Sequence, residues 1–310
     1  MPENKRFLPE GLRPPSDCSL QSLKTAAETG EILEATVQRC GVDHTLHLSL
    51  GGIPAQIPRQ EVNAPWINGS ERDIAVLSRV GKQICFTVQS VTSDEKGAPV
   101  AHLSRREAQE QAMDHFLSCL EPGMVLTCRV TRMEAFGAFV DVGCGIVGLL
   151  PIERISVSRI PHPNVRFREG EKILAAVLRI DRQQRRITLT HRELLGTWLE
   201  NASLFSAGET VRGIVRSVQE YGTFIELTPN LSGLADCRVP LQPGDGVSVY
   251  LKSLQPERMK IKLHVIEKLP PSEEIFPLRY QVTDGQLDHW IYSPPGCERR
   301  VETDFTAPVP

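Results

Sequence analysis

Residues 134–143 read EAFGAFVDVG and residues 219–227 read QEYGTFIEL. Each stretch consists of an aromatic residue, a glycine, a small residue and a phenylalanine, followed by apolar and acidic residues in alternation. In both copies the first aromatic residue lies 13 residues after one glycine and 12 residues before another. The matched positions are Gly123, Phe136 and Gly148 in the first copy, and Gly208, Tyr221 and Gly233 in the second. Spacing that agrees at three points indicates a repeated structural unit.

The sequence around the first copy, residues 121–192, predicts a small closed β barrel. Apolar and polar residues alternate there in short segments that are typical of strands. The expected strands are 124–132, 138–142, 145–150, 172–181 and 186–190. Five short strands with a long insertion after the third are typical of the OB-fold, a five-stranded barrel. Residues 206–268 repeat this plan with a shorter insertion, so we expect a further barrel there.

A weaker copy of the unit precedes these two, at residues 27–104. Asp43 and Leu46 stand 13 and 16 residues after Gly30, where the other copies have aromatic residues. We therefore expect a degenerate barrel that keeps its core and lacks the aromatic pair. The predicted fold is mainly β: tandem OB-fold barrels joined by short helices. The remaining predicted segments are a flexible arm at 1–26, linker helices at 105–120 and 193–205, and a C-terminal β-hairpin extension at 269–310.

The first linker helix and the C-terminal hairpin have specific sequence signals. Ser104 precedes the helix and Glu107 follows three residues later, which is typical of a capping box. Apolar residues spaced four apart predict one buried face of this helix; they are Ala108, Ala112, Phe116 and Leu120. Residues 278–282 and 286–292 flank a Thr-Asp-Gly turn sequence, which predicts a β-hairpin.

Side-chain parity predicts that each of the two regular barrels has aromatic residues on its outer surface. Successive residues of a strand point to opposite faces, and the apolar members of the motif are expected in the core. The residues then expected to point outward are Phe139 and Asp141 in the middle unit and Phe224 and Glu226 in the third. Phe136 and Tyr221 flank them from the preceding turn. Such paired rings form a platform for single-stranded bases, each worth about 1–3 kcal/mol.

The net charge of −3 is unevenly distributed along the chain. Residues 121–193 have twelve Lys and Arg against eight Asp and Glu, whereas residues 269–310 have three against seven. By the same parity, charged residues of the last two strands point outward beside the aromatic residues: Arg179, Asp181 and Arg186 in the middle unit, and Lys260 and Lys262 in the third. Outward cations beside aromatic rings can pair with phosphates or stack on bases. No basic recognition helix is evident, so the pattern favours single strands over duplex grooves.

Each of these features also has a purely structural interpretation. Phe136 and Tyr221 would plug the barrel ends, Phe139 and Phe224 would pack against a linker helix, and the charges would form an ordinary solvated face. The combination of all three features in two copies favours nucleic-acid binding.

With these residues in place, the middle and third units resemble the S1 domain, the RNA-binding OB-fold named for ribosomal protein S1. LSRREAQ at 103–109, HRELLGTW at 191–198 and LTPNLSGLAD at 227–236 also resemble short, multi-repeat bacterial forms of that protein. The resemblance implies RNA contacts by Phe136, Phe139, Asp181 and Arg185 or Arg186 in the middle unit, and by Tyr221, Phe224 and Lys260 or Lys262 in the third. The family's histidine after the third strand is replaced by Pro151 and Asp236. His162, in the loop segment RIPHP, matches a different family histidine and is either its substitute or a solvated loop residue.

The sequence contains no enzyme motif that we can identify. It lacks a phosphate-binding loop, G-x-S-x-G and H-E-x-x-H, and its eight cysteines include no CxxC pair. A site around Asp288, His289 and Cys297 is the remaining catalytic alternative. No apolar segment approaches the roughly 20 residues of a membrane span, and no signal peptide is evident at the start. We expect a reduced, cytoplasmic protein without catalytic residues, cofactor, metal, membrane contact or small-molecule substrate.

The predicted function is binding of single-stranded RNA, in particular mRNA, near the small ribosomal subunit, by a short ribosomal protein S1-like factor of translation. Three alternatives remain open. The chain is a non-ribosomal RNA chaperone or a regulator of mRNA turnover or transcription, an accessory RNA-binding subunit of an RNA-processing enzyme, or a structural protein whose barrels all bind protein.

Overall fold

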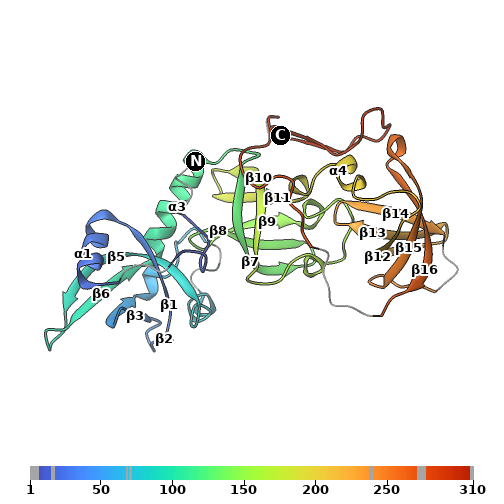
Figure 1. Cartoon of the computed structure of the whole chain (residues 1–310). Helices are drawn as coiled ribbons and strands as arrows, with labels where there is room; N and C mark the ends of the chain where they lie inside the picture. Colours follow the sequence, from blue (N-terminus) through green and yellow to red (C-terminus); the bar gives the residue numbers. More distant parts are fainter. Residues whose placement is uncertain are drawn as a thin grey trace.

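The computed structural model describes residues 7–14, 18–67, 69, 72–236, 240–270 and 277–307. Three β modules follow one another in a row along the chain (Figure 1). The C-terminal segment then returns over the junction of the last two modules (Figure 1). None of the helices in the described part of the chain has the length and apolarity that a membrane span needs.

The middle module is a closed five-stranded barrel, as the sequence predicts. Its strands are β7 (Val125–Glu134), β8 (Gly137–Gly143), β9 (Ile146–Pro151), β10 (Lys172–Asp181) and β11 (Arg186–Thr190), closed in the order β10-β11-β9-β8-β7. The inward residues of β8, Ala138, Val140 and Val142, are buried in one core with Phe167. The loop after β9 contains two short 3₁₀ helices, η3 (Ile152–Arg154) and η4 (Pro163–Val165).

The third module repeats this barrel. Its strands are β12 (Thr210–Gln219), β13 (Gly222–Thr228), β14 (Leu231–Asp236), β15 (Gly246–Gln255) and β16 (Lys260–Lys268), with η6 (Pro256–Arg258) before β16. They close in the order β12-β13-β14-β16-β15, which matches the middle barrel strand for strand. The repeat predicted from the two aromatic motifs is therefore confirmed in the fold.

The first module keeps the strand order of the barrel, but its first strand is split. The strands β1 (Ile32–Thr36), β2 (Arg39–Cys40), β3 (Leu46–Leu50), β4 (Ile53–Ile57), β5 (Gln83–Ser93) and β6 (Pro99–Ser104) form one sheet in the order β1-β5-β6-β4-β3-β2. Between β1 and β2 the backbone changes partner, because the N–H of Val37 donates to Lys82 and that of Gln38 to His47. The module is thus a degenerate barrel opened at its first strand, with η2 (Arg59–Glu61) and α2 (Asp73–Leu77) after β4.

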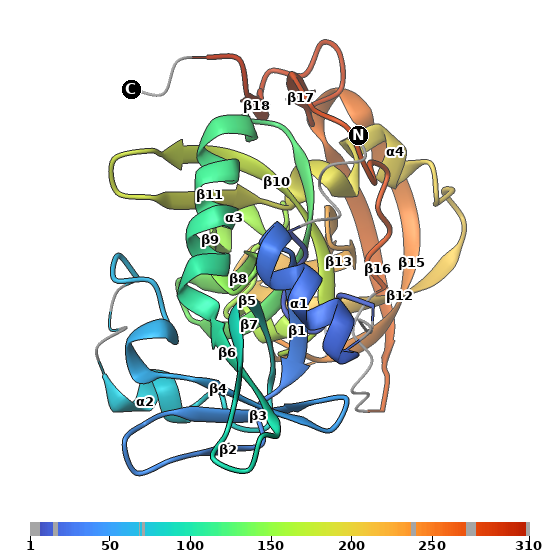
Figure 2. The ribbon, with the colours of Figure 1, turned by 90° about the vertical axis from the view of Figure 1, so that its left-hand side faces the viewer.

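The linker helix α3 (Arg105–Cys119) begins where the sequence predicts. The hydroxyl of Ser104 accepts the N–H of Glu107 at 2.9 Å, which caps the first turn. The Glu107 carboxylate accepts from the hydroxyl of Thr87 on β5, so the cap also ties the helix to the first module. The expected apolar face is buried, and α3 packs on β5 (Figure 2).

The second linker is shorter than the predicted helix over 193–205. It consists of η5 (Arg192–Leu195) and α4 (Trp198–Ala202), separated at Gly196, whose φ of +83° breaks the helix. A complete capping box between Thr197 and Glu200 begins α4. Trp198 is buried in the core of the third barrel, so the linker fixes that barrel to the middle one.

The flexible arm predicted for residues 1–26 is wrong where the structure describes it; residues 1–6 and 15–17 lie outside the described residues. Helix α1 (Leu20–Thr29) buries Leu23 and Ala26 in the core of the first module. Residues 7–14 lie between the first two modules, where Phe7 and Glu10 are buried. The prediction failed because a short segment with few apolar residues gave no sign of the partners that cover it.

The C-terminal extension forms a two-stranded sheet, but with other partners than predicted. Strand β17 (His289–Ile291) pairs with β18 (Glu302–Asp304), so the Pro-Pro-Gly segment lies in their connection. The predicted Thr-Asp-Gly turn instead brings Gly285 and Leu287 alongside the start of the middle barrel, where they bond to Val125 and Gly123. A Cβ on Gly123 would lie 1.9 Å from the Leu287 carbonyl oxygen, so only glycine allows this approach.

Candidate nucleic-acid interface

Each regular barrel presents a pair of aromatic rings at the same place. The centroids of Phe136 and Phe139 are 5.8 Å apart with an interplanar angle of 86°, and those of Tyr221 and Phe224 are 6.2 Å apart at 87°. Phe136 is 56% exposed and Tyr221 is 71% exposed, whereas Phe139 and Phe224 are half-buried. Rings exposed to this extent do not plug a barrel end. Their edge-to-face contact leaves ring faces available for stacking.

The glycine between the two rings fixes this geometry. In the middle barrel a Cβ on Gly137 would lie 2.5 Å from the Leu150 carbonyl oxygen. In the third barrel a Cβ on Gly222 would lie 2.9 Å from the Ala235 carbonyl oxygen. A side chain at either position would push the second strand away from the third. The glycine therefore lets the turn approach the neighbouring strand and holds the two rings on one side.

A row of outward residues crosses the strands beside the rings. In the middle barrel the paired residues are Arg132, Phe139, Leu149, Thr188 and Arg179. In the third barrel they are Ser217, Phe224, Leu234, Lys262 and Ser253. The structure thus brings the predicted Arg179 and Lys262 into the same rows as Phe139 and Phe224. It also adds Arg132, which the sequence interpretation missed. The position of Arg132 just before the aromatic turn could have indicated its place in this row.

The other predicted charges lie in the adjoining row. Arg186 is paired across the strands with Asp181, and Lys260 with Gln255. Arg186 and Lys260 are exposed. The middle barrel therefore has three exposed arginines around its aromatic pair, at positions 132, 179 and 186, and the third barrel has two lysines.

Two predicted residues are engaged elsewhere. The guanidinium of Arg185 lies 5.6 Å from the ring centroid of Trp66 and 4.0 Å from the carboxylate of Asp114. It therefore contacts the first module and α3. The Nδ1 atom of His162 accepts the N–H of Asn164 and caps η4, which gives this histidine a local role in its loop.

The acidic residues of the two motifs point out of their barrels, as parity predicts, but they are not exposed. Asp141 is buried at the junction with the first module, where it accepts the backbone N–H groups of Glu10, Gly143 and Gly145. Burial and the nearby Glu10 carboxylate raise the pKa of Asp141 to about 7. Glu226 is buried at the junction of the middle and third barrels. The same motif position therefore serves as a docking point, for the N-terminal segment at Asp141 and for the loop of the middle barrel at Glu226.

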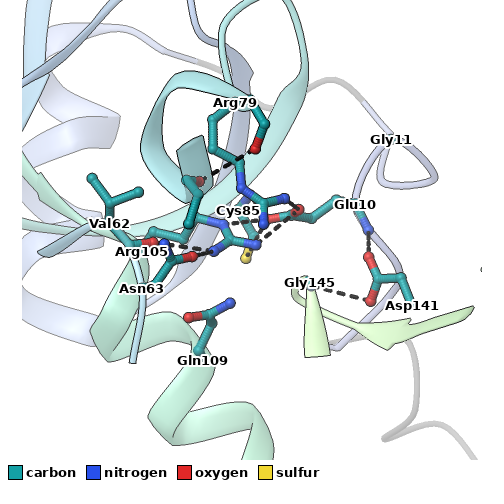
Figure 3. A network of polar contacts seen from close by, with 12 residues as sticks. Glu10, Gly11, Val62, Asn63, Arg79, Cys85, Arg105, Gln109, Asp141 and Gly145 are labelled. Carbon is teal, nitrogen blue, oxygen red and sulfur yellow. Dashed lines mark hydrogen bonds and ion pairs between the residues drawn. The ribbon is translucent and has the colours of Figure 1, made fainter. Parts of the chain in front are cut away.

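Glu10 forms the centre of the first junction (Figure 3). Its two carboxylate oxygens accept from Nε and Nη2 of Arg105 at 2.7 and 3.1 Å, and one also accepts the N–H of Cys85. Arg105 donates further bonds to Val62 and Asn63. Burial acts to raise the pKa of Glu10, but the charges of Arg105 and Arg79 and the hydrogen bonds from Arg105 and Cys85 together outweigh burial and lower that pKa. The N-terminal segment therefore joins the first module to the middle barrel.

The second junction contains a buried ion triad. Arg166, from the loop of the middle barrel, and Arg216, on β12, both donate to the Glu226 carboxylate, at 2.5 and 2.7 Å. The side chains of Arg166 and Glu226 are 0% exposed, and burial lowers the pKa of Arg166. Two cations share one carboxylate, so the negative charge of Glu226 is needed to compensate the positive charges of both arginines.

The C-terminal segment reinforces the second junction. The hydroxyl of Tyr280 bonds to His191, at the end of the middle barrel, and Tyr292 donates to the Asn230 carbonyl oxygen of the third. Burial lowers the pKa of His191 to about 4, so this histidine is neutral near pH 7. Thr303 donates to the buried Glu193 of the linker. These contacts hold the two aromatic pairs in a fixed relation.

The described residues contain no group of three His, Cys, Asp or Glu side chains that could hold a metal ion. In the suggested C-terminal site, the exposed His289 pairs with Asp304 across the two-stranded sheet at 3.1 Å. Cross-strand pairing accounts for this contact.

Comparison with known proteins finds S1-type relatives of this chain. The family model for the S1 RNA binding domain matches residues 120–192. The chain is 26% identical over 284 residues to the small ribosomal subunit protein bS1 homolog of Bacillus subtilis, covering 87% of this chain and 72% of that protein. It is 32% identical over 190 residues to small ribosomal subunit protein bS1 of Leuconostoc lactis, covering 56% of this chain and 44% of that protein. Among solved structures, GSP13 from Bacillus subtilis is 30% identical over 24% of this chain and 56% of that protein, with a TM-score of 0.23. The chain thus spans less than half of the second curated relative.

Proposed function

Since this chain is an S1-like protein with tandem S1-type OB-fold barrels, we propose that its middle and third barrels bind single-stranded RNA. The observation that carries this proposal is the exposed aromatic pair, present twice in the same geometry and flanked by outward cations. Every base has a face that can stack on an aromatic ring, so such a surface accepts many sequences. The arginines and lysines beside it supply phosphate contacts.

We further propose that the RNA is mRNA and that the chain acts in the cytoplasm, on or near the small ribosomal subunit. Its similarity to bS1 proteins supports this assignment. The role is that of a binding protein, because base stacking and phosphate contacts account for the arrangement of rings and cations.

The two barrels are expected to act together. The second binding event on one RNA strand becomes intramolecular, which raises the overall affinity when the geometry permits both contacts. Because the buried triad and the C-terminal segment fix the junction, little conformational freedom is lost when a strand contacts both barrels.

Replacing Phe139 by alanine is expected to weaken binding of an oligo(U) strand by about 1–3 kcal/mol, since one stacking ring is lost. Phe224→Ala is expected to have a smaller effect, because the third barrel has fewer cations around its pair. Fluorescence anisotropy titration at a fixed salt concentration measures the oligo(U) affinity of both variants. Val147→Ala is the matched control, since Val147 is an exposed apolar residue of the same barrel that pairs across from Asp141 rather than from Phe139.

Wild-type affinity in Phe139→Ala, with the barrel folded, would contradict the assignment of this surface. Co-sedimentation with ribosomes at moderate salt tests the ribosomal part separately. An RNA-binding chain that stays in the supernatant would instead favour a free RNA chaperone or regulator.

A further inference from the structure

The third barrel has an outward row of residues for which RNA binding at the aromatic pair gives no explanation. Tyr250 on β15 is paired directly across from His264 on β16, which in turn is paired with Asp236 on β14. Tyr250 is 40% exposed, and His264 and Asp236 are exposed as well. A partly exposed tyrosine on a barrel wall has side-chain surface available to a partner.

The equivalent row of the middle barrel is covered. There Ala176 on β10 stands in the place of Tyr250 and is paired with Thr190, which stands in the place of His264. Ala176 is 0% exposed, because Leu194 of the linker and Phe305 of the C-terminal segment pack over it. The chain therefore covers this face in one barrel with its own residues, and places an aromatic ring there in the other.

The row of Tyr250 adjoins the row of Phe224. Leu234 and Lys262 of the Phe224 row lie two residues before Asp236 and His264 on the same strands, which is a separation of about 7 Å. Leu234 is itself exposed. Among the described residues, outward side chains thus follow one another from Phe224 across β14 and β16 to Tyr250.

The charges on this surface suit a polyanion. Lys252 and Lys262 are exposed and flank Tyr250 and His264. Among the described residues of the two rows the carboxylate is Asp236, which lies 3.1 Å from Nζ of Lys252 and 3.6 Å from Nδ1 of His264. The Lys252 ammonium offsets the negative charge of Asp236 and reduces its repulsion of phosphates.

On the premise of the proposed function, we propose that Tyr250 is a further base-stacking position and that the RNA strand continues from Phe224 across β14 and β16 to β15. Lys262 and His264 contact the strand between the two stacking positions. This extended surface, made of Leu234, Lys252, Lys262, His264 and Tyr250, gives the third barrel a longer RNA site than the aromatic pair alone. OB folds bind about 4–16 nucleotides each, so a site of this length is within their range.

The test uses the full chain with Phe136→Ala and Phe139→Ala, which removes stacking in the middle barrel. Oligo(U) strands of about 4 and about 12 nucleotides distinguish a short site from a long one. In this background Tyr250→Ala is expected to weaken binding of the longer strand about fivefold to tenfold and to leave the shorter strand unchanged. Tyr250→Phe is expected to bind both strands normally, because the ring is kept. Leu199→Ala, at an exposed apolar residue of α4, is the control.

Equal binding of the longer strand by Tyr250→Ala and its parent would overturn the inference, and capture of a protein partner through this face instead would do the same. Phe224→Ala is expected to weaken the binding of both strands. No effect of Phe224→Ala would contradict the proposed function itself, so the two failures are distinguishable. Crosslinking of a 4-thiouridine 12-mer to the unmodified full chain is a second measurement. Adducts at Tyr250 or His264 are expected, and adducts confined to the aromatic pair and the Phe224 row would overturn the extended path.

Discussion

Replacing Glu226 by alanine is expected to lower the free energy of unfolding of the third barrel by about 3–5 kcal/mol, because removing one partner of a buried ion pair leaves an uncompensated charge. Here two charges lose their partner. The side chain of Arg166 is 0% exposed and that of Arg216 is 9% exposed, and both donate to this carboxylate. Among the described residues, Nε and Nη1 of Arg166 have no hydrogen-bond partner, so few other contacts can take over.

Urea unfolding followed by tryptophan fluorescence measures this loss, since Trp198 and Trp290 both lie in the core cluster of the third barrel. The variant Trp66→Phe removes the signal of the first module. Glu220→Ala, at an exposed acid of the turn before β13, is the control and is expected to change the stability by less than about 0.5 kcal/mol. A Glu226→Ala variant as stable as this control would show that the triad does not support the junction.

Arg105→Ala is expected to have a similarly large effect on the first junction, again about 3–5 kcal/mol. Arg105 is 0% exposed and makes two bonds to Glu10 and two to the segment after η2. Its removal leaves Glu10 as a buried carboxylate without its main partner. The N-terminal segment should then detach from β5 and β8.

Amide hydrogen exchange resolves this effect by module, which a single unfolding curve of a three-module chain does not. Faster exchange is expected at Glu10 and Cys85, whose N–H groups bond within the junction. Arg59→Ala is the matched control, since Arg59 of the same module is 45% exposed in its pair with the exposed Asp73 and a pair of that kind contributes less than about 1 kcal/mol. Unchanged exchange at both amides would contradict the role assigned to Arg105.

The sequence predicted the two regular barrels well because their strands are determined by patterns among neighbouring residues. Alternating apolar residues and matched glycine spacing locate β10 and β11 at the bounds that the structure shows. The capping signal at Ser104 is equally local. The split first strand could not be predicted, because it depends on which neighbours the backbone of Val37 and Gln38 finds.

The candidate site was predictable to the extent that side-chain parity determines it. Parity gives the side of the barrel to which a residue points, so Phe139 and Asp141 were both expected outside. Whether that side faces solvent depends on distant segments, and the Glu10 segment covers Asp141. For the same reason Arg185 was expected on the RNA surface but lies against Trp66.

In each regular barrel, the strand that carries the outward ring also carries the acid of the junction. The acid of the first aromatic motif binds the N-terminal segment and that of the second binds the middle barrel, while the Phe two residues earlier stays on the outer surface. One strand therefore both fixes the orientation of its barrel and presents the stacking ring. The proposed stacking ring and the docking acid thus lie within three residues of sequence, Phe139 to Asp141 in the middle barrel and Phe224 to Glu226 in the third.

The most direct test of the central claim is an oligo(U) titration of the full chain, at one fixed salt concentration, with all four rings removed: Phe136→Ala, Phe139→Ala, Tyr221→Ala and Phe224→Ala. The control carries alanine at two exposed valines of the same barrels, Val147 and Val218. Because each ring contributes about 1–3 kcal/mol, the four-ring variant is expected to bind at least about 100-fold more weakly than the control, with unchanged thermal unfolding. Equal affinities of the two folded variants would contradict RNA binding by these aromatic pairs.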